Sequence, residues 1–181
     1  NRWAVDSSGF IAKCGPWGGH KIAEQGLTVP EGTSTSHADP DNMSFFYYCR
    51  GKEIISDADY EMRKSTASHN TIMLEEHGQH GHCIMWPELW NYWPSMLEMR
   101  RDAGWTYAAC DGTDAYPGSS TLKLARRHFI FRDEVLVIAD ELESFGHLYF
   151  RNLLHTYGRV RLTETGAVIT CGKVAAAWRL Q

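Results

Sequence analysis

The sequence predicts an all-β fold, an antiparallel β-sandwich. Short apolar and aromatic runs recur along the chain, and turns rich in Gly, Asp, Asn or Arg separate them. No long segment has the 3.6-residue periodicity of an amphipathic helix. Strands at this spacing, without helices between them, are typical of an antiparallel sandwich or barrel.

The first half of the chain contains a predicted hairpin, a single strand and an irregular region. Residues 44–57, SFFYYCRGKEIISD, indicate a hairpin that turns near residues 50–52. Residues 69–76, HNTIMLEE, indicate a strand whose side chains alternate between two faces. Between residues 83 and 105 the pattern is irregular, and WPELWNYWP there is compatible with a helical turn or a loop.

The second half of the chain continues the series of strands. Residues 126–142, RRHFIFRDEVLVIADEL, indicate a second hairpin with its turn at residues 132–134. Its return strand is apolar enough over residues 135–139 to lie centrally in a sheet. Residues 146–155 and 159–171 add further strands, so we expect one sandwich domain over the whole chain.

Size and charge exclude several functions. A chain of 181 residues with 43% apolar residues is long enough for one domain and too apolar for a disordered protein. A net charge of −4 argues against a broad surface for nucleic acid or anionic membrane. No run approaches the ~18 apolar residues that a bilayer span needs.

The chain ends and the cysteines bear on the parent protein. The sequence starts at Asn1 rather than Met and stops at Gln181 within a strand-like run, so we expect an excerpt of something longer. The parent could be periplasmic, secreted or cytoplasmic. Five cysteines without a C-x-x-C pair argue against a disulfide framework or a thiolate zinc cluster, and mildly favour a reducing compartment.

Acidic and histidine side chains gather before the first hairpin. SHADPDNMSF, residues 36–45, places His37, Asp39 and Asp41 within five positions. In an extended backbone these three side chains would share one side, but Pro40 argues that the segment bends. The segment is either a polar loop in front of a strand or half of a site that needs residues from elsewhere.

The other half of such a site would come from the residues that follow the hairpin. Asp57 ends the hairpin and His69 opens the next strand, although local spacing alone does not bring Asp39 and Asp57 together. Two carboxylates and an imidazole suit zinc or manganese, and calcium if carbonyls and water complete the ligand set. The alternative is a solvated acidic loop with an ordinary surface histidine.

An ordered set of motifs resembles a known family. The quoted stretches are GPWGG (15–19), SHADPDNMSF (36–45), RGKEIISDADY (50–60), STASHNTIML (65–74), HGQ (77–79), ARRHFIFRDEVLVIADEL (125–142) and LLH (153–155). Their order is similar to that in the C-terminal β-sandwich domain of the heparinase II/III-like polysaccharide lyases, which include alginate and heparin or heparan sulfate lyases. The resemblance covers most of the chain and implies a supersandwich-like fold.

The resemblance also implies roles for individual residues. His37 matches a histidine that faces the cleft between domains, and its expected role is catalytic, in charge stabilisation or proton relay; the alternative is a loop-holding hydrogen bond. Asp57 and His69 match metal ligands, and Asp39 stands where the family has a second ligand histidine. We therefore expect a structural divalent metal on Asp39, Asp57 and His69, with zinc first and manganese or calcium as alternatives.

The implied reaction is β-elimination of an acidic polysaccharide or oligosaccharide that contains uronic acid. In the family many catalytic groups sit in an N-terminal α/α toroid, and this chain has no helical array of that kind. We therefore expect the toroid to be a partner domain of the same protein, and the chain alone to be inactive.

Sugar stacking and two rival functions stay open. Trp86 and Trp90 are the expected carbohydrate-binding residues, because an aromatic face suits a pyranose ring, but such residues also serve as core or lid packing. One rival is a non-catalytic module that binds carbohydrate or supports a neighbouring domain. The other is an all-β iron-dependent oxygenase, in which His37 and Asp39 would join a distant histidine such as His155.

Overall fold

The computed structural model describes residues 5–24, 38–58, 63–75, 77–84, 92–117 and 122–180, and nearly all of its regular structure is β. The strands are β1 (Gly9–Lys13), β2 (Ser44–Cys49), β3 (Lys52–Ile55), β4 (Ile72–Leu74), β5 (Ser95–Asp102), β6 (Trp105–Asp111), β7 (Leu122–Arg132), β8 (Val135–Ser144), β9 (Phe150–Asn152), β10 (Arg159–Thr163), β11 (Gly166–Cys171) and β12 (Val174–Arg179). Helical structure in these ranges is short: α1 (His20–Glu24) and the 3-10 turns η1 (Thr66–Ser68) and η2 (Thr113–Ala115).

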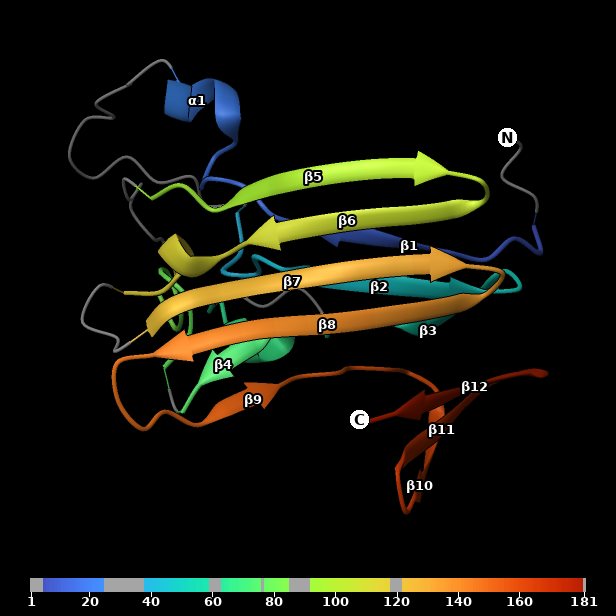
Figure 1. Cartoon of the computed structure of the whole chain (residues 1–181). Helices are drawn as coiled ribbons and strands as arrows, with labels where there is room; N and C mark the ends of the chain where they lie inside the picture. Colours follow the sequence, from blue (N-terminus) through green and yellow to red (C-terminus); the bar gives the residue numbers. More distant parts are fainter. Residues whose placement is uncertain are drawn as a thin grey trace.

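The strands form antiparallel sheets, which confirms the predicted fold class. One sheet has the order β1-β2-β3 and another the order β5-β6-β7-β8, and the latter lies in front of the former in Figure 1. The β4-β9 pair and the β10-β11-β12 sheet complete the described strands. Every pairing between them is antiparallel.

The core lies between the β1-β2-β3 sheet and the β5-β6-β7-β8 sheet. Phe45 on β2 and Phe129 on β7 are 1% and 0% exposed, and their ring centroids lie 5.8 Å apart. Phe10 on β1 stacks on Phe129 with centroids 5.4 Å apart. Alternate residues of each strand supply this layer because side chains of a strand point to opposite faces. The aromatic rings therefore fix the two sheets face to face.

The two predicted hairpin turns are present, and they meet. In the β2–β3 turn Arg50 and Gly51 both have positive φ, and a Cβ on Gly51 would lie 1.8 Å from the carbonyl oxygen of Val5. In the β7–β8 turn Asp133 and Glu134 both have positive φ. Such two-residue turns match the twist of antiparallel strands. The Arg50 guanidinium pairs with the Glu134 carboxylate at 2.9 Å and so joins the two hairpins.

Two expectations about the strands are wrong. Strand β8 ends the described β5–β8 sheet rather than lying centrally, and Val135 and Val137 are 61% and 48% exposed. An apolar run does not distinguish a central strand from an edge strand, because local sequence does not reveal the neighbours. The region expected to be irregular contains strand β5. Its side chains are partly or fully exposed, so charged residues occur on both faces and the strand lacks a regular alternation of apolar and polar residues.

The topology places three polar segments at one end of the β1-β2-β3 sheet. Strands β2 and β3 are antiparallel, so the segment before β2 and the segment after β3 lie at the same end. The register pairs Tyr47 with Ile55, which brings Asp57 toward the level of Phe45. The turn η1 then leads into β4. No helix in the described ranges is long and apolar enough to cross a membrane.

Candidate metal centre

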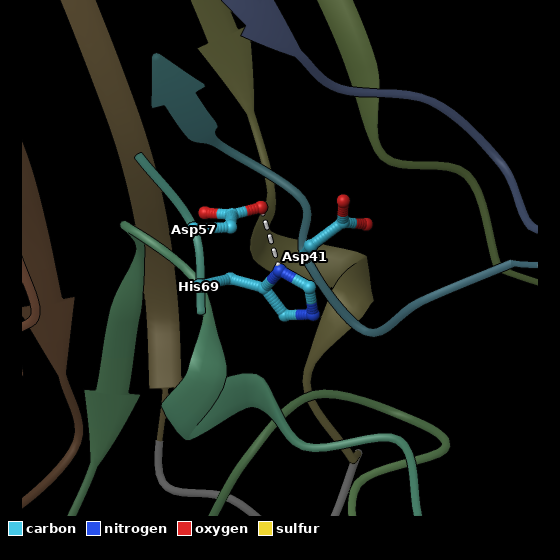
Figure 2. A group of neighbouring side chains, drawn as sticks. All are labelled: Asp41, Asp57 and His69. Carbon is cyan, nitrogen blue, oxygen red and sulfur yellow. Dashed lines mark hydrogen bonds and ion pairs between the residues drawn. The ribbon is translucent and has the colours of Figure 1, made fainter. Parts of the chain in front are cut away.

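Three side chains from these segments converge on one point. Asp41 precedes β2, Asp57 follows β3 and His69 follows η1, and one ligand atom from each lies within 4.8 Å of the others. Figure 2 shows the three side chains turned toward a common region. Asp41 is buried, and the side chains of Asp57 and His69 are 13% and 12% exposed. The described chain therefore holds a largely desolvated group of potential ligands.

The Asp57 carboxylate is held on both oxygens. Its Oδ2 lies 2.8 Å from His69 Nδ1, and its Oδ1 accepts hydrogen bonds from the backbone N–H and the side-chain Nδ2 of Asn70, at 3.1 and 3.0 Å. A carboxylate that accepts from an imidazole and an amide group loses little by leaving water. Asp57 in turn fixes the orientation of the imidazole.

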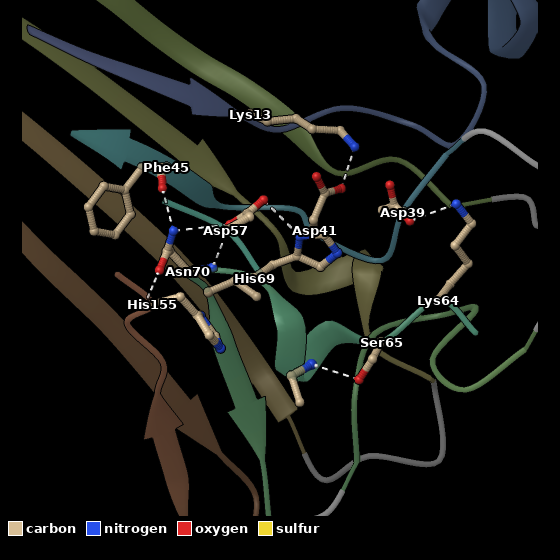
Figure 3. A network of polar contacts seen from close by, with 12 residues as sticks. Lys13, Asp39, Asp41, Phe45, Asp57, Lys64, Ser65, His69, Asn70 and His155 are labelled. Atoms are coloured by element: carbon tan, nitrogen blue, oxygen red, sulfur yellow. Dashed lines mark hydrogen bonds and ion pairs between the residues drawn. The ribbon is translucent and has the colours of Figure 1, made fainter. Parts of the chain in front are cut away.

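Asn70 links this pair to the strands around it (Figure 3). It is fully buried, and besides Asp57 its Nδ2 also donates to the carbonyl oxygen of Phe45 at 2.9 Å. Its Oδ1 accepts the backbone N–H of His155 at 2.6 Å. The side chain therefore joins β2 and the segment after β9 to the candidate ligands.

Two lysines flank the cluster and separate the roles of the two loop aspartates. Lys13 forms an ion pair with Asp41, and Lys64 pairs with Asp39 at 3.0 Å (Figure 3). The Lys64 side chain is 2% exposed, so Asp39 offsets a buried positive charge. Asp41, which the family resemblance did not assign as a ligand, joins Asp57 and His69, whereas Asp39 faces Lys64. That Asp39 also binds metal stays a prediction.

The bend at Pro40 explains why residue spacing did not identify Asp41. The Asp41 N–H donates to the carbonyl oxygen of Asp39 at 2.9 Å, so the backbone turns sharply between the two aspartates. The side-chain alternation of an extended strand does not hold across such a turn. The sequence did contain one sign that Asp41 was a candidate ligand, because both aspartates lie in the same short segment before β2.

Burial and charge act in opposite directions on the site. Burial lowers the pKa of His69, but the hydrogen bond to Asp57 and the charges of Asp41, Asp57 and Asp39 outweigh it and raise this pKa. Burial raises the pKa of Asp41, while the charges of Lys13 and His69 oppose that rise. The carboxylates therefore favour a positive charge at the site, either a proton on the His69 imidazole or a cation bound beside it.

The donor set fits a divalent cation. Carboxylate oxygen and imidazole nitrogen are both zinc ligands, and water commonly completes such a site. Asp57 is suited either to bind the ion directly or to hold the imidazole through Nδ1 while Nε2 binds it. A bound cation and the proton on His69 would compete, because both neutralise the same carboxylates.

Of the other predicted residues, the structure describes only His155. His37, Trp86 and Trp90 lie outside the described residues. His155, the distant histidine of the oxygenase alternative, lies on the opposite side of the network from Asp39 in Figure 3. Its backbone N–H serves the site by donating to Asn70.

Comparison with known protein families gives a match over the whole chain. A family model described as heparinase II/III-like, C-terminal, matches residues 1–181, the whole chain. The chain belongs to the heparinase II/III-like family. It is thus a member of a family of polysaccharide lyases, as the motif series predicted. Comparison with curated proteins found no match.

Family membership gives the polar cluster a context. The heparinase II/III-like domain spans every segment that carries a candidate ligand, namely the loop before β2, the end of β3 and the turn η1. Asp41, Asp57 and His69 therefore all lie within the matched domain.

Proposed function

We propose that this chain is the β-sandwich part of a polysaccharide lyase that cleaves uronic-acid-containing polysaccharide by β-elimination. Heparin-, heparan- or alginate-like chains are the expected substrates. The chain holds a structural divalent ion, zinc first, on Asp41, Asp57 and His69. The single observation that carries this proposal is the convergence of these side chains in a chain matched over its whole length by the family.

The reaction sets the demands on the rest of the site. The proton beside a uronate carboxylate is weakly acidic, so an enzyme must neutralise the carboxylate, place a base at the proton and supply an acid to the leaving oxygen. His37 is the residue of this chain proposed for charge stabilisation or proton relay at the substrate. It lies four positions before Asp41 in the sequence, so a fixed Asp41 limits where His37 can go.

The proposed ion has a structural role. When bound, it would tie the loop before β2 to the end of β3 and to η1, and thereby keep the histidine-bearing segment in one arrangement. The remaining catalytic groups would come from an N-terminal α/α toroid of the same protein. The isolated chain is then expected to bind acidic oligosaccharide without turning it over.

Two measurements test this proposal. Elemental analysis of the purified chain should find one zinc, manganese or calcium per molecule. Heparin, heparan sulfate and alginate, incubated with the chain plus the helical part of its parent, should give the ultraviolet absorbance of an unsaturated uronate, and the chain alone should not. A chain that neither retains nor takes up metal contradicts the metal assignment. Carbohydrate binding with no turnover in the combined sample would instead indicate a non-catalytic module.

A further inference from the structure

The Gln79 side chain forms two hydrogen bonds with the backbone of Asn42, the residue that follows Asp41. Its Oε1 accepts the backbone N–H of Asn42 at 2.7 Å, and its Nε2 donates to the carbonyl oxygen of the same residue at 2.8 Å. The Gln79 side chain is 2% exposed. One carboxamide thus satisfies both backbone groups of Asn42 within a buried environment, where unpaired groups would be unfavourable.

The loop before β2 needs such a restraint. The Ser44 N–H donates to the carbonyl oxygen of Asp41 at 3.1 Å, which closes a turn with Asn42 and Met43 at its centre. Met43 has a φ of 61°, in the left-handed region that side chains other than glycine rarely adopt. Since Met43 is fully buried as well, this conformation persists only if surrounding contacts determine it.

The surrounding contacts meet on Asn42. Thr71 Oγ1 donates to the Asn42 carbonyl oxygen at 2.6 Å, and the Gly15 N–H donates to Asn42 Oδ1 at 2.9 Å. Gln79 is itself fixed, because its backbone N–H donates to Thr66 Oγ1 in η1 at 2.9 Å. Through Gln79, the hydrogen bonds to Asn42 therefore connect the loop before β2 to η1, and His69 directly follows η1.

We propose that Gln79 is the positioning residue for Asp41. It holds the turn that sets the Asp41 carboxylate near Asp57 and His69, without contacting the ion itself. The role in metal binding rests on the proposed metal site. The role of Gln79 in fixing the loop before β2 does not depend on a bound metal. An experiment can therefore test the two roles separately.

The test replaces Gln79 by Met, which is similar in length and has no hydrogen-bonding amide. Ile169→Val is the matched control, because Ile169 is buried in the core on β11 and loses packing only. Zinc affinity is measured by titration calorimetry on the metal-free chain, and amide hydrogen exchange is followed in residues 38–44. Gln79→Met should weaken zinc binding about tenfold or more and speed exchange in that segment. Ile169→Val should change neither.

Each result bears on the proposal. Unchanged exchange in residues 38–44 of Gln79→Met overturns it, whether or not the parent chain binds zinc. Equal effects of both variants also overturn it, because general destabilisation would then explain the loss. If Gln79→Met does not fold, Thr71→Val removes one donor to Asn42 and should give the same two effects at smaller size; no effect there overturns the proposal. If the parent binds no zinc but exchange speeds up, the metal assignment fails and the positioning role stands.

Discussion

Two aspartates of the loop before β2 have different partners, although only Pro40 separates them. Asp41 lies with Asp57 and His69, whereas Asp39 pairs with the buried Lys64. Asp41 also pairs with Lys13, whose side chain is 51% exposed. The same residue type therefore stands in two settings, Asp41 beside two other candidate ligands and Asp39 against a buried lysine, and the direction of each carboxylate decides which.

Separate substitutions at these positions should have different effects. Asp41→Asn removes a charged candidate ligand and should weaken zinc binding at least about tenfold. Asp39→Asn should affect zinc far less, but it leaves Lys64 without its carboxylate and should lower the free energy of unfolding by about 1–3 kcal/mol. Titration calorimetry and urea unfolding measure the two effects. Loss of zinc in both variants to the same extent would return Asp39 to the ligand set.

At the scale of elements, Arg127 connects β7 to the segments that carry the site. It is fully buried, and its N–H groups donate to both oxygens of Asp140, to Asn152 Oδ1, and to the carbonyl oxygens of Met43 and Asn70. All five donors of the guanidinium are thereby used. This side chain holds Met43, which lies within the loop turn, and Asn70, which follows His69, against β7.

Arg127→Lys should therefore be strongly destabilising. An ammonium group cannot reproduce the fork of five donors, so buried acceptors would lose their partners. We expect the free energy of unfolding to fall by about 3 kcal/mol or more, as measured by urea unfolding. The neighbouring Arg126→Lys is the control, because that side chain is 39% exposed and its pair with Asp111 should contribute less than about 1 kcal/mol. Equal losses would contradict this account.

The end of β6 provides a pH-dependent element. Burial raises the pKa of Asp111, but hydrogen bonds from Thr113 and Arg126 outweigh it and lower this pKa. A carboxyl group whose pKa is lower in the folded state stabilises the fold above its unfolded pKa of about 4. That stabilisation is lost as the pH falls from about 4 through the lower folded value.

Asp111→Asn should accordingly cost about 1 kcal/mol near neutral pH, because it weakens the contacts with Thr113 and Arg126. The difference in unfolding free energy between the parent chain and the variant should shrink below about pH 4. Urea unfolding at neutral pH and at about pH 3 checks this. A difference that stays the same at both pH values would show that the charge of Asp111 is unimportant.

At the scale of the whole molecule, metal binding and folding should be coupled. The candidate ligands come from three separate segments, so an unfolded chain cannot offer them together. With free zinc about 100-fold above its dissociation constant, the linkage amounts to about 2.7 kcal/mol. For a domain of this size, that corresponds to a rise in Tm of about 5–10 °C.

Thermal unfolding with and without a chelator tests the coupling. The parent chain should lose this increment of Tm when the chelator is added. His69→Ala should already have lost it and should not respond, whereas His37→Ala should unfold nearly like the parent. A His69 variant with the parent's Tm in both conditions would count heavily against the metal centre.

Local patterns determined many of the strands and both hairpin turns, but they gave no sign of β1 or β6. Alternation of side chains and turn residues act over a few positions, so SFFYYCRGKEIISD and RRHFIFRDEVLVIADEL predicted their hairpins correctly. The same patterns placed β8 centrally and missed β5, because edge and interior strands differ in their neighbours rather than in their own sequence.

For the site, the sequence determined which segments carry candidate ligands and, through its ordered motifs, the family. Only the tertiary structure decided that Asp41 rather than Asp39 joins Asp57 and His69, and that Asn70, Gln79 and Arg127 hold them. The physical reason is that direction and burial of a polar side chain depend on contacts between segments distant in the chain. A turn at Pro40 and a buried lysine redirect one carboxylate, and neither effect follows from residue spacing.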